Sequence, residues 1–321
     1  MSDNKKERLN KKLVEVIRDE GISAQVRLKK LKYLVSLGAD VNARVDDKSV
    51  LSWAEALKED ELVLYLKEQG AKEWVLTEQD KKELGWQFWD ERGILKSLDE
   101  IKKLIEKGAY LNSFNKKGDS NLFCSAAGQG NKEIVDFLLE NGVDIDCVEK
   151  DRSTPLKVAI INWRGDMVSY LVNKGARIDI RDDIGMNAIC WAAYQGWVQL
   201  VEVLLKKGAN IEDKNKFGDT LLKIASDNNK VEVVEFLLKK GANIEAKNNQ
   251  GDTALIGASY WGHKEVVKVL LESGADVYQE NKCGNTALYY AKWFKKNEVV
   301  KLLREHKFKN SFLGKIFGKD K

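Results

Sequence analysis

Apolar residues in the second half of the chain recur as doublets separated by two positions. The clearest sets are Val233, Val234, Leu237 and Leu238, followed by Val266, Val267, Leu270 and Leu271. Positions i, i+1, i+4 and i+5 share one face of a helix with 3.6 residues per turn, so each set predicts a helix with one apolar stripe. One helix pair cannot bury such a stripe alone, so neighbouring pairs are expected to stack and share a core.

These helices belong to a tandem repeat. Glycines that close similar phrases stand 33 residues apart at positions 142, 175, 208, 241 and 274. Glycine adopts the left-handed conformation that ends many helices, and a small residue such as Ala225 or Ala258 lets two helices approach closely. Ser97 and Glu100 predict a capping box in a divergent repeat. We predict nine helix pairs, at residues 5–38, 46–70, 77–108, 118–142, 151–175, 184–208, 217–241, 250–274 and 283–305.

The phrases that open the repeats resemble the T-P-L-H-x-A box of ankyrin repeats. The match is clearest in Ser153–Ala159, Asp219–Ala225 and Asp252–Ala258, and Pro155 takes the family's proline position. The resemblance implies an all-α ankyrin-repeat solenoid of stacked helix pairs with short hairpin tips. It implies divergent N-terminal repeats and a cap at 1–117 and regular repeats at 118–305, and the sequence pattern predicts a basic amphipathic C-terminal tail at 306–321.

The histidine of the family's box is replaced in these repeats. The resemblance therefore implies the fold, but not the family's side-chain hydrogen bonding between neighbouring turns through that histidine. The replacements are Lys157, Cys190, Lys223, Ile256 and Tyr289.

Residues with catalytic or metal-binding chemistry are few and scattered. The four cysteines fall in different repeats without a C-x-x-C pair, and only two histidines exist. Metal ligands need clustered thiolates and imidazoles, and the chain has no glycine-rich phosphate loop, nucleophile elbow or H-E-x-x-H motif. We expect a non-enzymatic protein with no cofactor and no metal.

Hydropathy and charge also limit which cellular compartment and which classes of partner we expect. No apolar run approaches the ~20 residues of a membrane span, and the first residues lack the apolar core of a signal peptide. We expect a cytoplasmic protein, and export by a non-classical route stays open. Residues 13–300 hold 42 basic and 46 acidic residues, so the net charge of +4 comes from the basic ends. A nucleic-acid-binding stripe, which needs Lys and Arg concentrated along one face, is not expected.

The ankyrin resemblance implies a concave binding surface built from hairpin-tip residues and from positions seven and eight after the box Thr. Five of the ten helix-borne positions in the last five repeats are aromatic, although aromatic residues make up 9% of the chain. Rings on a solvated face favour a ligand, and nearby acids would orient a basic or amide-bearing one. The candidate residues are Ile184, Met186, Tyr194, Phe217, Asp219, Asp227, Asp252, Tyr260, Trp261, Trp293 and Phe294.

Other interpretations of these rings stay open. Trp293 and Phe294 fall in the last repeat, where a ring can simply seal the stack. Trp191 is expected on the core side of its helix, and Trp163 replaces the glycine between two helices, so both are interpreted as structural.

The tail has its own pattern, because Phe312, Leu313, Ile316 and Phe317 fall on one helical stripe among lysines. This pattern is typical of a helix that lies on a membrane surface, docks on a partner or caps the last repeat. We therefore expect a scaffold that recognises a peptide or protein segment on its aromatic face. The alternatives are a reader of a small cationic or aromatic ligand, such as methylated lysine, and an adaptor held weakly at a membrane through residues 308–321.

Overall fold

The computed structural model describes the chain except for residues 1–2, 20, 46–47, 72–77 and 318–321. Contacts divide the chain into two compact units. One comprises Met1–Gln87 and Lys102–Tyr110, and the other comprises Phe88–Ile101 and Leu111–Lys321.

The first unit is built from helix pairs around a leucine-rich core. Leu13, Leu31, Leu51 and Leu66 are buried in it. Arg27 is buried as well and forms an ion pair with Glu59, while its guanidinium also donates to the backbone oxygens of Val16 and Asp19. The elements are α1 (Asp3–Arg18), α2 (Ala24–Ser36), β1 (Arg44–Val45), β2 (Lys48–Ser49), α3 (Val50–Ala56), α4 (Asp60–Glu68), α5 (Glu78–Trp86) and the second part of α6 (Leu98–Glu106). The two short strands pair antiparallel, with Arg44 opposite Ser49.

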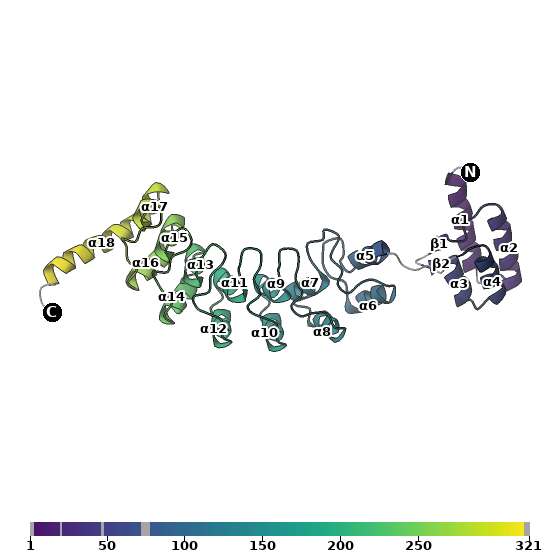
Figure 1. Cartoon of the computed structure of the whole chain (residues 1–321), viewed down its shortest axis with the longest axis horizontal. Coiled ribbons are helices and arrows are strands. Elements are labelled where there is room, and N and C mark those ends of the chain that lie inside the picture. The colour runs from purple at the N-terminus through teal and green to yellow at the C-terminus, as the bar shows by residue number, and fades with distance from the viewer. Residues whose placement is uncertain (1–2, 20, 46–47, 72–77, 318–321) are drawn as a thin grey trace. The chain divides into compact units, whose positions relative to one another are not determined.

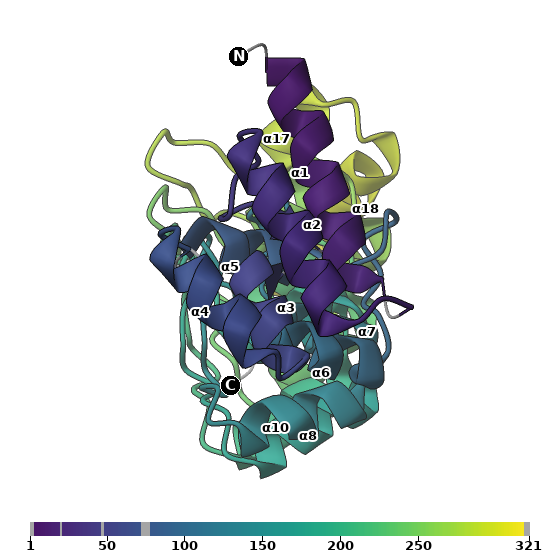
Figure 2. The ribbon, with the colours of Figure 1, turned by 90° about the vertical axis from the view of Figure 1, so that its right-hand side faces the viewer.

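The second unit consists of helix pairs that stack in two rows (Figure 1). The first row holds α7 (Leu122–Gln129), α9 (Pro155–Ile161), α11 (Ala188–Gln195), α13 (Leu221–Asp227), α15 (Ala254–Trp261) and α17 (Ala287–Trp293). The second row holds α8 (Lys132–Glu140), α10 (Gly165–Asn173), α12 (Val198–Lys206), α14 (Val231–Lys239), α16 (Lys264–Glu272) and α18 (Asn297–Phe317). In the turned view of Figure 2, α8 and α10 again lie side by side. The hairpin loops project on the side of the first row, and we call the surface of tips and first-row helices the tip face.

The sequence explains where these helices begin and end. Thr220 and Thr253 each accept a hydrogen bond from the backbone N–H three residues later, which caps α13 and α15. The predicted capping box of Ser97 and Glu100 is present, since each side chain accepts from the backbone N–H of the other residue. Gly241 has a φ of 86°, the left-handed value expected of a residue that follows a helix end.

The predicted apolar stripes form the core between repeats. Val233, Val234 and Leu237 of α14 are fully buried, as are Ala225 and Ala258 on the first-row helices. The repeat architecture predicted from the period is therefore confirmed: among the described helices, α1 packs on α2, α3 on α4, and each first-row helix from α7 to α17 on the second-row helix that follows it. The helix of the tail extends to Phe317, but the apolar stripe predicted at 312–317 lies outside the residues whose side chains the structure describes.

Hydrogen bonds also join successive hairpin tips, which the loss of the family's histidine did not lead us to expect. The Asn248 side-chain nitrogen donates to Asp219 Oδ1 at 2.8 Å, and Asn281 donates to Asp252 Oδ1 at 2.8 Å. Backbone bonds run in parallel, for example from Asn249 N to the Phe217 oxygen at 3.0 Å. Asn and Asp side chains therefore provide the contacts between neighbouring turns and fix the spacing of the tip face.

Candidate functional site

A chain of aromatic rings crosses from α15 to α17 on the tip face. The Tyr260 ring lies 5.0 Å from that of Trp261 and 4.5 Å from that of Phe294, measured between centroids. On α17 the Tyr289 ring is 5.5 Å from Tyr290 and 5.9 Å from Trp293. We call these six rings the aromatic cluster: Tyr260, Trp261, Tyr289, Tyr290, Trp293 and Phe294.

The outer rings of this cluster face solvent. Trp261 is 54% exposed and Trp293 is 68% exposed, while Tyr260 is half-buried among the rings of Trp261, Tyr290 and Phe294. Trp293 and Tyr289 also line a 470 Å³ pocket with Leu288 and Lys292. Large aromatic side chains gain most of their stabilisation from burial, so exposed rings in contact with one another suit a surface that a ligand covers. The exposure of Trp293 also argues against the alternative that this ring seals the last repeat.

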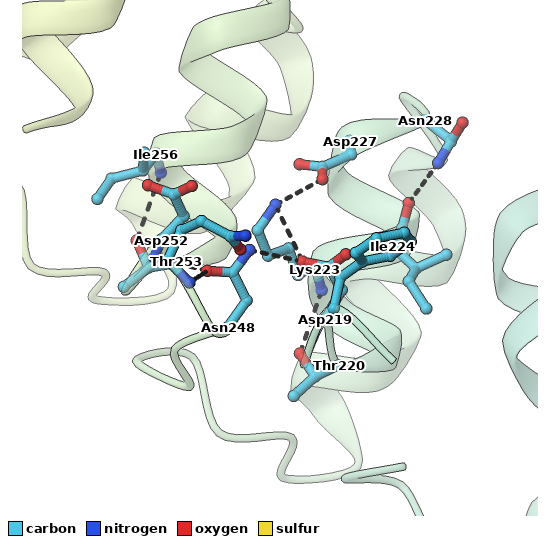
Figure 3. Close-up of polar contacts among 12 residues, drawn as sticks. Asp219, Thr220, Lys223, Ile224, Asp227, Asn228, Asn248, Asp252, Thr253 and Ile256 are labelled. Carbon is cyan, nitrogen blue, oxygen red and sulfur yellow. Dashed lines mark hydrogen bonds and ion pairs between the residues drawn. The ribbon is translucent and has the colours of Figure 1, made fainter. Parts of the chain in front are cut away.

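A group of three carboxylates lies around one buried lysine (Figure 3), and the Asn281 side chain links one of them, Asp252, to Tyr290 of the aromatic cluster. Lys223, at the family's histidine position, has a side chain that is only 7% exposed. Its ammonium lies 2.6 Å from Asp227 Oδ2 and 3.5 Å from Asp219 Oδ1. Asp252 projects from the next hairpin tip and also acts electrostatically on Lys223. We call Lys223, Asp219, Asp227 and Asp252 the acid cluster; it carries more negative than positive charge when all four groups are ionised.

Burial and charge have opposite effects on the two partners of the closest pair. Burial raises the pKa of Asp227 to about 6, with help from the like charges of Asp219 and Asp252 and against the attraction of Lys223. Burial alone would lower the pKa of Lys223, but the carboxylates of Asp227 and Asp219 outweigh it and raise that pKa above its usual value. The lysine is thus held as an ammonium, whereas the ionised form of Asp227 is only partly compensated.

Gly257 of α15 makes room for this ion pair. A Cβ atom added at Gly257 would overlap Asp227 Oδ1 and would come within 3.0 Å of the Lys223 Nζ. Asp227 Oδ1 is shielded from solvent and has no hydrogen-bond partner among the described residues. The carboxylate of one repeat therefore packs directly on the backbone of the next.

A second lysine at the histidine position is accommodated in another way. The Lys157 ammonium lies 2.9 Å from Asp182 Oδ2 and 4.9 Å from the centroid of the Trp191 ring. The Trp191 Nε1 donates to the same Asp182 oxygen at 2.8 Å. These contacts support the interpretation of Trp191 as structural, although its ring is half-buried at the tip face and does not lie in the core. Trp163 is 54% exposed and stacks on Trp197 at 5.3 Å.

The structure separates the remaining predicted site residues into two groups. Ile184, Tyr194 and Phe217 are exposed on the tip face. The prediction that Met186 lines this surface is wrong, because its side chain is only 4% exposed. The tip folds back at this residue, whose backbone N–H donates to Asp182 Oδ1 at 2.9 Å, and the side chain turns inwards.

Sequence reasoning missed four residues of the site. Tyr289 and Tyr290 stand three and four positions after the box Thr, outside the family's ligand positions, and the run of aromatic residues in that helix was the available signal. The sequence did not reveal that Lys223 and Gly257 lie together, although the replacement of the family's histidine by Lys223 was a visible signal.

Among the described residues, no group of three or more His, Cys, Asp or Glu side chains is arranged to hold a metal ion. No helix in the described part of the chain has the length and apolar character to cross a membrane.

Comparison with known proteins agrees with the stacked helix pairs. The family profile for ankyrin repeats (3 copies) matches residues 94–182, 175–248 and 245–312. This chain belongs to the ankyrin-repeat family, whose repeats generally bind other proteins.

The matches to individual proteins are local. A putative ankyrin repeat protein of Rickettsia bellii is 29% identical over 100 residues, which cover 31% of this chain and 55% of that protein. The inactive serine/threonine-protein kinase TEX14 of mouse is 31% identical over 97 residues, 30% of this chain and 7% of that protein. Phosphocholine transferase AnkX of Legionella pneumophila is 32% identical over 100 residues, 31% of this chain and 10% of that protein. This chain therefore matches only a part of each relative.

Proposed function

We propose that the tip face of α13, α15 and α17 binds a peptide segment of another protein that carries a basic side chain next to apolar or aromatic ones. The observation that carries the proposal is the exposed aromatic cluster beside the acid cluster. Trp261 and Trp293 offer large apolar contact area at small cost in side-chain entropy, which is why such residues dominate interface hot spots. The proposal assigns the chain no catalytic step.

Charge supports a basic segment as the partner. The acid cluster holds three carboxylates and one ammonium. The neighbouring aromatic cluster includes Trp261, which is 54% exposed. A cationic side chain over the Trp261 face would gain about 0.5–2 kcal/mol from the cation–π interaction, and the acids would add attraction at longer range. One basic side chain near this surface is engaged within the protein, since Lys216 donates to the backbone oxygen of Asp183 at 2.7 Å.

The arrangement of the rings favours an extended segment over a small ligand. A reader of methylated lysine needs rings that enclose the ammonium on several sides. Here successive ring contacts lead from Trp261 on α15 to Trp293 on α17, and both terminal rings are open to solvent. A row of this kind suits a ligand with several side chains.

The test is selection from a random linear peptide library displayed on phage, followed by affinity measurements on the enriched peptides. Trp261→Ala should weaken binding by at least ~2 kcal/mol, the size of a hot-spot truncation, with the melting temperature unchanged within a few degrees. Trp163→Ala is the matched control, since Trp163 has the same 54% exposure but stacks on Trp197, away from the aromatic cluster. Enriched peptides that bind Trp261→Ala as tightly as the control would refute the proposal. Loss of binding only on deletion of residues 308–321 would favour the tail-driven adaptor instead.

A further inference from the structure

We infer that Asp227 is a proton-accepting switch at the joint between α13 and α15, and that its protonation in mild acid tightens the packing of these two repeats. The inference concerns the stack itself and does not depend on the proposed function. It follows from the contacts of the two carboxylate oxygens.

The two oxygens of Asp227 have unequal surroundings. Oδ2 accepts from the Lys223 ammonium at 2.6 Å. Oδ1 has neither solvent contact nor a hydrogen-bond partner among the described residues, and it lies against the backbone of Gly257. A carboxylate is stable in a protein interior only when its oxygens are hydrogen-bonded or paired, so half of this one lacks compensation.

The charged groups around Asp227 come from every side of the joint. Lys223 stands one turn earlier on the same helix, and Asp219 and Asp252 come from successive hairpin tips. From the start of α16, the His263 ring places Nε2 3.0 Å from the backbone oxygen of Asp227, where a protonated nitrogen donates. One lysine thus compensates the charge of three carboxylates. When Asp227 is protonated, the Lys223 ammonium still has the Asp219 carboxylate at 3.5 Å.

The direction of the switch follows from linkage. The pKa of Asp227 is raised to about 6 in the folded chain, above the ordinary value of 3.8, so the folded state binds this proton more tightly than the unfolded state. The resulting stabilisation is complete below the ordinary pKa and is lost as the pH rises through about 6. Mild acid therefore favours the closed joint, the opposite of the usual behaviour of a carboxylate in an ion pair.

The experiment is a pH titration of the full chain by NMR, with the Asp227 side-chain carboxyl carbon assigned through its bonds to the backbone. We expect a titration midpoint near 6, and a midpoint near 3.8 would overturn the inference without the need for any variant. Hydrogen exchange of the α15 amides gives the second readout, because local opening of the joint exposes them.

Protection factors in α15 should rise about tenfold between about pH 7.5 and about pH 5, the value that linkage gives for this displacement of the pKa. Asp227→Asn, which mimics the protonated side chain and leaves His263 in place, should abolish that rise. Asp183→Asn is the control, since Asp183 is an exposed tip aspartate, and it should retain the rise. Persistence of the full rise in Asp227→Asn would refute the coupling.

Discussion

Replacement of Gly257 by alanine tests the packing of the acid cluster most directly. The new methyl group would overlap Asp227 Oδ1, so the carboxylate must move away from Lys223. Removal of one partner from a buried ion pair costs about 3–5 kcal/mol, but Lys223 keeps Asp219 at 3.5 Å, and we expect a loss of up to about 3–4 kcal/mol. Alanine gains about 1 kcal/mol over glycine inside a helix. The expected net effect on the free energy of unfolding is a loss of about 1–3 kcal/mol.

The assay is urea unfolding of a double-mutant cycle with Asp227→Ala. Once the carboxylate is absent, the nearest atom to the methyl group is the flexible Lys223 Nζ at 3.0 Å, and Gly257→Ala should then be neutral or stabilising by up to about 1 kcal/mol. The coupling between the two sites should therefore reach about 2 kcal/mol. Equal effects of Gly257→Ala in both backgrounds would refute the packing described here.

Three further predictions follow from single residues. Ala258→Leu should destabilise the chain by about 1–3 kcal/mol in thermal or urea unfolding, because Ala258 is fully buried between helices and the added side chain overpacks the joint. Trp261→Ala should change stability by less than about 1 kcal/mol, as expected of a ring that is 54% exposed, and a loss near 3 kcal/mol in the same assay would show that it is a core residue. Trp163 has a φ of 57°, a strained value for a bulky residue, so Trp163→Gly should recover about 1 kcal/mol of strain, offset by a similar loss of its stacking on Trp197. A melting temperature lowered by more than about 8 °C in Trp163→Gly would contradict that balance.

The fold was predictable because each repeat carries the same local sequence signals. The 33-residue spacing of glycines such as Gly208 and Gly241, the capping Thr220 and the doublets of α14 each specify local structure, and repetition multiplies the signal. The exposure of Trp261, but not the half-burial of Tyr260, followed from the family's ligand positions. Features set by residues within one repeat could thus be predicted from the sequence.

Contacts between repeats could not be predicted in this way. The overlap of Asp227 with the Gly257 position depends on the separation of α13 and α15, which no pattern within one repeat determines. The burial of Met186 depends on how its hairpin tip folds back onto Asp182. Tyr290 joins the site through Asn281, whose side chain bridges the Tyr290 hydroxyl at 3.0 Å and Asp252 at 2.8 Å. The contacts of Asp227 with Gly257 and of Asn281 with Asp252 join segments about one repeat apart, whereas the Met186 contact lies within one hairpin tip.

Lys223, which is buried, and Lys157, which is partly buried, show how such contacts differ between parts of the tip face. Trp191 and Gly257 each stand four residues after the residue that caps the first helix of their repeat. Each faces the lysine of the preceding repeat, so Trp191 lies opposite Lys157 and Gly257 lies opposite Lys223. The tryptophan covers its lysine with a ring and donates to the paired Asp182, whereas the glycine leaves space that a second acid, Asp227, occupies. Lys157 also lies 3.4 Å from Asp151 Oδ2, so each lysine contacts two carboxylates, and the two sites differ in what covers the ammonium. At Lys223 a third carboxylate, Asp252, adds negative charge beside α15, next to the exposed rings that we propose as the binding surface.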